Sequence, residues 1–130
     1  MTSDRDLLFV YGSLRPAFDG DMARWLAAAA RHLGSAWASG RLYRLAGYPG
    51  FVPEGEGRVA GDLFSLPDPV PLLAVLDAFE ECSEAFPEPR EYRRERLVVE
   101  GPQGPVRAWA YVYARPVDAL ALIPDGDFLG

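Results

Sequence analysis

The sequence predicts a protein of the α+β class, in which a small curved or closed β-sheet is accompanied by two helices. The predicted elements run strand, helix, strands, helix, strands, which lacks the regular strand–helix alternation of a parallel doubly wound sheet. The strands are joined by short turns rich in glycine and proline, and several contain glycine, which permits strong curvature. With 130 residues, 49% of them hydrophobic, the chain is expected to form one globular domain over 1–130.

The first half of the chain is predicted to hold one helix and three strands. A short apolar run over 7–10 ends at a Tyr-Gly-Ser turn, which is typical of a buried strand. The Ala-rich segment 21–33 is predicted as a helix, with Gly34 just past its C-terminal end. Further strands are predicted at 37–45 and 57–65, and a turn is predicted at 47–50.

The second half is predicted to hold a helix and a β-hairpin. The helix covers 70–80, with Asp68 as its N-cap and proline in its first turn. Residues 83–90 are predicted as a loop, because two prolines interrupt any regular pattern there. Alternating segments at 92–100 and 106–114 are separated by Gly-Pro-Gln-Gly, which indicates a hairpin, and the tail after them is predicted to be irregular.

Composition and charge exclude several classes of function. The formal net charge of −6 argues against a general nucleic-acid binder and against a binder of anionic membranes, since both need a basic surface. All 13 basic residues are arginine, so no lysine is available for Schiff-base or pyridoxal-phosphate chemistry. A single cysteine forms no internal disulfide, and the N-terminal residues form no apolar signal segment, so a soluble cytoplasmic protein is expected.

The turn after the first strand is the first candidate site, and it consists of Tyr11, Gly12, Ser13 and Leu14. Gly12 has no Cβ, so the backbone can turn sharply there or a ligand can approach it closely. Backbone N–H groups that converge at such a turn suit a carboxylate or a developing oxyanion. The alternative is a tight strand-to-loop turn that binds nothing.

Glu80 is the candidate acid–base group. It follows Leu73 by seven residues and Leu76 by four, so it falls on the apolar side of the predicted helix. Desolvation and the negative end of the helix dipole are both expected to raise its pKa, as a general acid/base at neutral pH requires. The alternative is an ion pair between Glu80 and an arginine of the 90–96 cluster, which would only tie the loop down. Asp77 is the lesser candidate for this role. The alternative is that Asp77 forms a hydrogen bond at the end of the helix.

The single histidine and the single cysteine are given no catalytic role. His32 is predicted to lie in the last turn of the first helix, where the dipole favours a positive imidazole. Cys82 lies close to Glu81 and Glu84, which disfavour its thiolate, so it is not expected to be a nucleophile. One cysteine and one histidine make a zinc site improbable, so no metal is expected.

Taken together, these residues resemble the γ-glutamylcyclotransferase superfamily, and the matching pieces run in order through nearly the whole chain. The Tyr-Gly-Ser turn at 11–13, the Leu-Asp-x-x-Glu helix end at 76–80 and the Tyr-x-Arg at 92–94 are specific in that order and at that length. The other matching pieces are Gly40-Arg41-Leu42-Tyr43, Gly47-Tyr48-Pro49-Gly50, Gly61-Asp62-Leu63-Phe64 and Ala108-Trp109-Ala110-Tyr111-Val112-Tyr113.

The resemblance implies a small mixed β-barrel flanked by helices and an enzyme that cyclises a γ-glutamyl amide. In that reaction the α-amine of the substrate attacks its own γ-carbonyl, which gives 5-oxoproline and a free amine without a metal or other cofactor. The resemblance implies that Glu80 takes a proton from the α-ammonium and gives it to the leaving nitrogen. It also implies that the backbone at 11–14 holds the glutamyl carboxylate or carbonyl oxygen and that Tyr113 lines the pocket, with Tyr111 as the second choice.

The chain departs from the family pattern in three places. Glu81 stands where the family often has glycine, the segment 82–91 is long and acidic, and Phe128 replaces the tryptophan of a Gly-Asp-Trp near the end. These departures leave the substrate open. The alternatives are therefore a related enzyme that acts on a different γ-glutamyl conjugate, a binding module of the same fold without turnover, and an interaction protein that uses the acidic loop.

Overall fold

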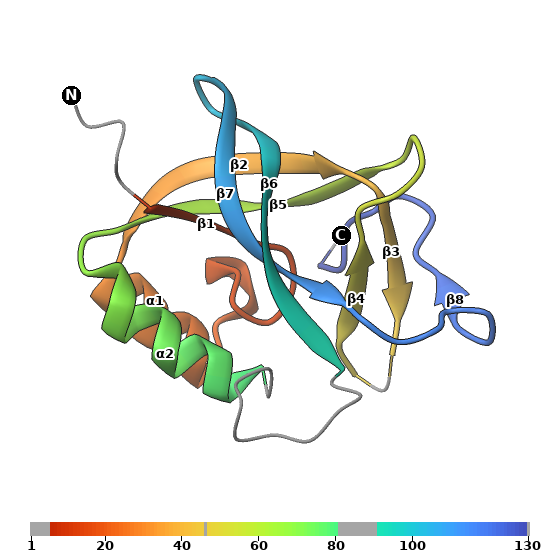
Figure 1. The fold of residues 1–130 in the computed structure, drawn as a ribbon, viewed down its shortest axis with the longest axis horizontal. Coiled ribbons are helices and arrows are strands. Elements are labelled where there is room, and N and C mark those ends of the chain that lie inside the picture. The colour runs from red at the N-terminus through yellow and green to blue at the C-terminus, as the bar shows by residue number, and fades with distance from the viewer. Residues whose placement is uncertain (1–5, 46, 81–90, 130) are drawn as a thin grey trace.

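A closed five-stranded barrel forms the centre of the computed structural model, which describes residues 6–45, 47–80 and 91–129 (Figure 1). The order of the strands around the barrel is β1-β5-β2-β6-β7. Their bounds are β1 Asp6–Val10, β2 Arg31–Ser39, β5 Arg58–Leu66, β6 Tyr92–Gly101 and β7 Gly104–Tyr113. The barrel confirms the α+β class and the architecture that the resemblance implied.

Two α-helices and a small sheet accompany the barrel in the described part of the chain. The helices are α1 (Asp21–Ala29) and α2 (Pro69–Phe79), and a short 3₁₀ helix, η1 (Pro16–Phe18), precedes α1. The second sheet has the order β4-β3-β8, with β3 Arg41–Arg44, β4 Pro49–Val52 and β8 Ala121–Leu122. Among the described residues, no helix is long and apolar enough to cross a membrane.

The barrel closes by pairing strands from the two ends of the chain. Strand β1 runs antiparallel to β5 over its whole length and meets β7 in parallel, with Leu8 opposite Trp109. Strand β2 is antiparallel both to β5 and to β6, and its contact with β6 places Trp37 opposite Glu100. Parallel and antiparallel pairs together make the barrel mixed, and β1, which leads into the turn, lies between β5 and β7.

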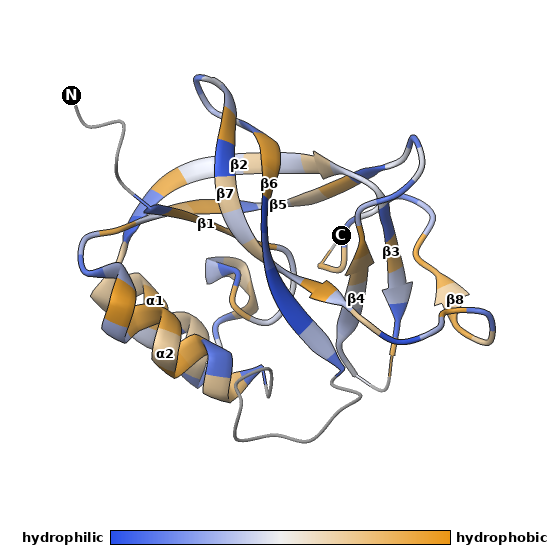
Figure 2. Ribbon diagram, viewed as in Figure 1, coloured by the Kyte–Doolittle hydropathy of each residue, from blue (hydrophilic) through white to orange (hydrophobic). Residues whose placement is uncertain are grey.

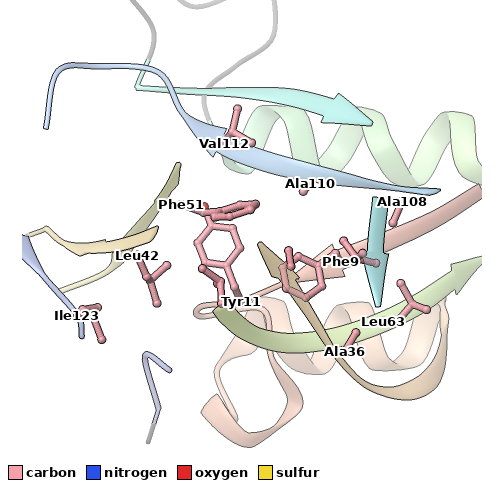
Figure 3. Packing of buried hydrophobic residues seen from close by; sticks show 13 residues of the cluster. Phe9, Tyr11, Ala36, Leu42, Phe51, Leu63, Ala108, Ala110, Val112 and Ile123 are labelled. Atoms are coloured by element: carbon pink, nitrogen blue, oxygen red, sulfur yellow. The ribbon is translucent and has the colours of Figure 1, made fainter. Parts of the chain in front are cut away.

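The strands of the barrel separate two hydrophobic cores, because successive side chains of a strand point to opposite faces. Inside the barrel, the rings of Phe9 and Tyr11 both contact the ring of Phe51 edge-on, with centroids 6.2 and 5.4 Å away (Figure 3). Outside the barrel, Leu8 and Val10 pack in a cluster to which both helices contribute. The hydropathy colouring is orange along much of α1 and α2, whereas the first half of β6 is blue (Figure 2).

The first helix is shorter than predicted. Helix α1 ends at Ala29, and Ala30 already has an extended backbone, with φ −133° and ψ 169°. Although alanine favours helix, pairing with β5 draws the following residues into β2, where Arg31 lies opposite Ser65. The placement of His32 in a helix was therefore wrong. Gly34 has a φ of +135° and stands at a register shift in β2, so it forms part of a β-bulge and does not cap the helix.

The strand predicted over 37–45 is interrupted at Gly40, which separates β2 from β3. Gly40 has a φ of +148°, and a Cβ on it would lie 2.5 Å from the carbonyl oxygen of Val52. The predicted turn at 47–50 overlaps the start of β4 at Pro49, and the predicted irregular tail contains β8.

The second helix and the hairpin are confirmed. Helix α2 begins after its N-cap Asp68, and β6 and β7 pair from Tyr92 opposite Tyr113 to Gly101 opposite Gly104. The predictions made for Glu81, Cys82 and the loop up to residue 90 fall outside the described residues.

Candidate active site

A pocket of about 220 Å³ brings together the turn after β1 and the end of α2. It is lined by residues 9–14, by Tyr48 and Pro49, by Phe79 and Glu80, by Glu91 and Tyr92, and by Tyr111. The lining therefore contains five of the predicted site residues, namely Tyr11, Gly12, Ser13, Leu14 and Glu80. The residues come from segments that are far apart in the sequence, and the barrel brings them together.

The turn at 11–14 lines the pocket, and a backbone hydrogen bond closes it. The N–H of Arg15 donates a hydrogen bond of 3.0 Å to the carbonyl oxygen of Gly12, which closes the turn. A Cβ on Gly12 would lie 2.8 Å from Cγ of Pro49, so glycine allows the turn and the proline to pack closely. The Tyr11 ring faces the barrel interior, where its hydroxyl donates a bond of 2.6 Å to the carbonyl oxygen of Tyr111. Burial raises the pKa of Tyr11 well above its ordinary value, so this phenol stays protonated.

Glu80 is the residue that follows the last turn of α2, and it is half-buried. Its N–H donates a hydrogen bond of 2.8 Å to the carbonyl oxygen of Leu76, which fixes its backbone. Burial raises the pKa of the Glu80 carboxyl to about 7, and the nearby negative charge of Glu91 adds to this effect. The carboxyl is therefore populated in both protonation states near neutral pH, which suits a group that must accept and then return a proton.

Arginines of the 90–96 cluster that the structure describes pair with carboxylates other than Glu80. Arg94 binds both oxygens of Asp77, with Nε 2.8 Å from Oδ1 and Nη2 3.1 Å from Oδ2. Arg96 pairs with Asp6 at 2.9 Å, and Arg93 pairs with Glu95. Asp77 also accepts a hydrogen bond of 2.7 Å from the hydroxyl of Tyr111, so its described partners come from β6 and β7.

Among the other lining residues, Tyr48 and Glu91 were not placed in the site by sequence reasoning, and Tyr92 was named only as part of the Tyr-x-Arg motif. The Tyr48 hydroxyl donates a hydrogen bond of 2.8 Å to Glu91, and the Tyr92 hydroxyl donates one of 2.6 Å to the carbonyl oxygen of Pro49. Burial raises the pKa of the Tyr92 phenol, and the charge of Glu80 adds to the shift. The Tyr-Pro pair within the glycine-rich turn was a signal for Tyr48, whereas Glu91 could be placed only once β6 was positioned against the turn.

Tyr113 is not among the lining residues of this pocket. Its ring packs edge-on against that of Tyr92, with the centroids 5.7 Å apart, and Tyr92 lines the pocket directly. Tyr111, the second choice, does line the pocket.

His32 lies outside this pocket. His32 projects from β2, and its Nε2 lies 2.9 Å from Oδ1 of Asp62. Within the described ranges, no three histidine, cysteine, aspartate or glutamate side chains are grouped as metal ligands.

The closed mixed barrel and its two helices define a protein of γ-glutamylcyclotransferase type, in which the turn after β1 faces a glutamate at a helix end. The chain matches the family described as "Gamma-glutamyl cyclotransferase, AIG2-like" over residues 8–130, and it belongs to this family.

Known relatives agree with this assignment. The chain is 38% identical over 122 residues to the γ-glutamylcyclotransferase family protein YtfP of Escherichia coli K12. The aligned residues cover 94% of this chain and 95% of YtfP. The solution structure of Escherichia coli ytfP has a TM-score of 0.68 at 37% identity, covering 95% of this chain and 96% of the other. A crystal structure of a mouse AIG2-like protein has a TM-score of 0.75 at 21% identity, covering 95% and 88%, and shows the shared fold.

Proposed function

We propose that this protein is an enzyme that cyclises a γ-glutamyl amide, releasing 5-oxoproline and a free amine. The observation that carries the proposal is Glu80, a half-buried carboxyl with a pKa of about 7 in the same pocket as the turn at 11–14. Membership of the γ-glutamyl cyclotransferase family supports the reaction class. A carboxyl of this kind can take a proton from an ammonium group and return it to a leaving amine at neutral pH.

The reaction needs proton transfer and correct positioning of the substrate. Glu80, as the carboxylate, accepts a proton from the substrate α-ammonium, and the free amine attacks the γ-carbonyl carbon to form a new C–N bond. The tetrahedral intermediate then collapses, the bond to the original amide nitrogen breaks, and protonated Glu80 donates the proton to that nitrogen. The attacking nitrogen releases its second surplus proton, which the departing amine takes up from solvent, so that 5-oxoproline is left with a neutral ring amide. Nucleophile and electrophile belong to one molecule, so holding the substrate in a folded conformation accelerates the attack.

The turn after β1 is proposed to bind the glutamyl end of the substrate. Backbone N–H groups at Gly12, Ser13 and Leu14 would hold the carboxylate or the oxygen that becomes negative during the attack. The support for this role is that the turn lines the same pocket as Glu80 and that Gly12 lets the backbone pack closely there. Tyr111 and Tyr92 would bound the space beside the substrate.

The test is to measure 5-oxoproline released from a panel of γ-glutamyl dipeptides and γ-glutamyl amines, by mass spectrometry. We expect the wild type to release product from at least one member of the panel. Because Gln cannot carry the proton, Glu80→Gln is expected to lower kcat by roughly 10²- to 10⁴-fold while the variant still binds that compound.

The matched control is Glu54→Gln, which changes an exposed glutamate outside the pocket and is expected to keep wild-type activity. If a folded wild-type protein binds panel members and converts none of them, the proposal fails and the non-catalytic binding module replaces it. Full activity of Glu80→Gln would remove Glu80 from the mechanism.

A further inference from the structure

Arg15 directly follows the turn that lines the pocket, and two carboxylates from distant parts of the chain hold its side chain. Its Nε–H donates a hydrogen bond of 2.8 Å to Oδ2 of Asp62, and its Nη1 donates one of 3.0 Å to Oδ1 of Asp127. The Arg15 and Asp62 side chains are only 14% and 11% exposed, so this ion pair is largely withdrawn from water. The guanidinium therefore has a fixed position relative to both partners.

Asp62 is itself fixed by the barrel. It lies on β5, opposite Val10, the last residue of β1, and opposite Ser35 of β2. Its second oxygen, Oδ1, lies 2.9 Å from Nε2 of His32. Both oxygens of the buried carboxylate are thus engaged, one by the residue after the turn and the other by a neighbouring strand.

Asp127 belongs to a C-terminal segment that is also attached to β5. The N–H of Ala60 donates a hydrogen bond of 2.8 Å to the carbonyl oxygen of Gly126, next to Asp127. The N–H of Asp127 donates one of 3.2 Å to a side-chain oxygen of Asp125, which orders this segment locally. Arg15 is therefore bound on two sides by groups that β5 positions.

We propose that Arg15 is a positioning residue that sets the conformation of the turn at 12–14 for the substrate, and that Asp62 and Asp127 hold its guanidinium in place. The same residue closes the turn, because its own N–H bonds the carbonyl oxygen of Gly12 at 3.0 Å. This inference rests on the proposed function, since it assigns a purpose to the geometry of the turn that would bind the glutamyl end.

The burial and the geometry of the Arg15 ion pairs favour a positioning role over a purely stabilising one. Removing two charges from water costs about as much as their attraction returns, so a buried ion pair is weak evidence for stability and can instead specify one conformation. In addition, the planar guanidinium directs its N–H groups in fixed directions, and here two of them reach different carboxylates. A lysine ammonium would keep the charge and lose this geometry.

The first experiment compares the steady-state kinetics of Arg15→Ala, Arg15→Lys and Asp62→Asn in the full chain. A displaced turn should bind the glutamyl end poorly, so we expect kcat/KM to fall by roughly 10- to 100-fold in each variant, mainly through a higher KM. Added methylguanidinium should restore part of the activity of Arg15→Ala, because it can occupy the site between the two aspartates. It should have no effect on Arg15→Lys, whose side chain fills that space.

The control is Arg24→Ala, which removes an arginine that also binds two aspartates, Asp19 and Asp21, but on the exposed surface. We expect its KM to equal that of the wild type. An unchanged KM in a folded Arg15→Ala and a folded Asp62→Asn would overturn the inference. So would a loss in kcat alone that methylguanidinium does not restore.

A second measurement separates this inference from the proposed function. Amide hydrogen exchange of Gly12, Ser13 and Leu14 is followed in the wild type and in Asp62→Asn, which keeps the size of the side chain and removes its charge. Faster exchange confined to the turn would support the positioning role of Arg15. It would do so even if the wild type released no 5-oxoproline, because a lack of product would contradict only the proposed reaction. Unchanged exchange at the turn, or equal acceleration throughout the barrel, would overturn the positioning role.

Discussion

At the scale of single residues, the electrostatics of the pocket involve two carboxylates, Glu80 and Glu91. Burial is the main reason that the pKa of Glu80 reaches about 7, and the charge of Glu91 is the second. Glu91 also accepts a hydrogen bond from Tyr48, so its position is fixed within the pocket wall. A neighbouring group that need not transfer a proton can thereby tune the pKa of the residue proposed to do so.

The variant Glu91→Gln tests this tuning. A negative charge on Glu91 opposes a second negative charge on Glu80, so removing it should lower the pKa of Glu80. In the wild type, kcat/KM is expected to decline below about pH 7, where Glu80 becomes protonated. In Glu91→Gln that decline should begin at lower pH, which a pH profile of 5-oxoproline release would show. Superimposable profiles would mean that Glu91 does not act on the ionising group.

At the scale of elements, local signals predicted some parts of the fold well. Helix α2 could be predicted because Asp68 and the prolines after it mark its start, and the β6–β7 hairpin because its turn residues separate two alternating runs. The end of α1 could not be predicted, because the residues after Ala29 continue a helix-favouring sequence and become extended through their pairing with β5. Long-range pairing of that kind leaves no mark on a short window of sequence.

The pocket shows the same division between local and long-range information. Helix periodicity made Glu80 a candidate, and its glycine and the preceding strand made the turn at 11–14 another, but each kept a non-functional alternative until the family resemblance favoured it. Glu91 and Tyr48 lie in the wall because β6 and the β3–β4 connection are folded against that turn. Their membership depends on tertiary contacts, which spacing along the chain does not reveal.

Any side chain at Gly61 in strand β5 is expected to lower the stability of the fold. A Cβ there would lie 2.1 Å from the carbonyl oxygen of Val10 and 2.7 Å from the ring of Phe9. Because a backbone carbonyl in a paired strand cannot move aside, Gly61→Ala should destabilise the protein by about 1–3 kcal/mol, measured by denaturant unfolding. Gly101→Ala is the control, since its nearest contact is the flexible end of Leu63 at 3.1 Å. Equal stability of the two variants would argue against close packing of β1 on β5.

At the scale of the whole molecule, the free energy of unfolding should vary with pH, because ionising the Glu80 carboxyl in its pocket is unfavourable. Its pKa is raised from 4.5 to about 7 on folding, so between these values the folded protein binds more protons than the unfolded chain does. Stability should therefore be highest below pH 4.5 as far as this group is concerned, and should decrease as the pH rises towards 7. Other groups add their own dependence, which a variant can subtract.

Glu80→Gln isolates that contribution. Glutamine carries no charge at any pH, so the variant avoids the cost of ionising a buried carboxyl and should be more stable than the wild type at pH 8. The expected difference is at most roughly 3 kcal/mol, and it should shrink as the pH falls towards 4.5. Urea unfolding of both proteins at pH 5 and pH 8 measures it. A wild type that is as stable as the variant at pH 8 would show that ionised Glu80 costs the fold little.

The closure of the barrel by β1 and β7 also has a consequence for folding during synthesis on the ribosome. Strand β1 is made first, yet Leu8 pairs with Trp109, and the hydroxyl of Tyr11 bonds a carbonyl 100 residues further along the chain. Contacts of such separation form slowly, because a long stretch of chain must be ordered before they can be made. The nascent chain must therefore carry the apolar strand β1 without its β7 partner until Trp109 and Tyr111 have been synthesised, and the pocket can be completed only after that.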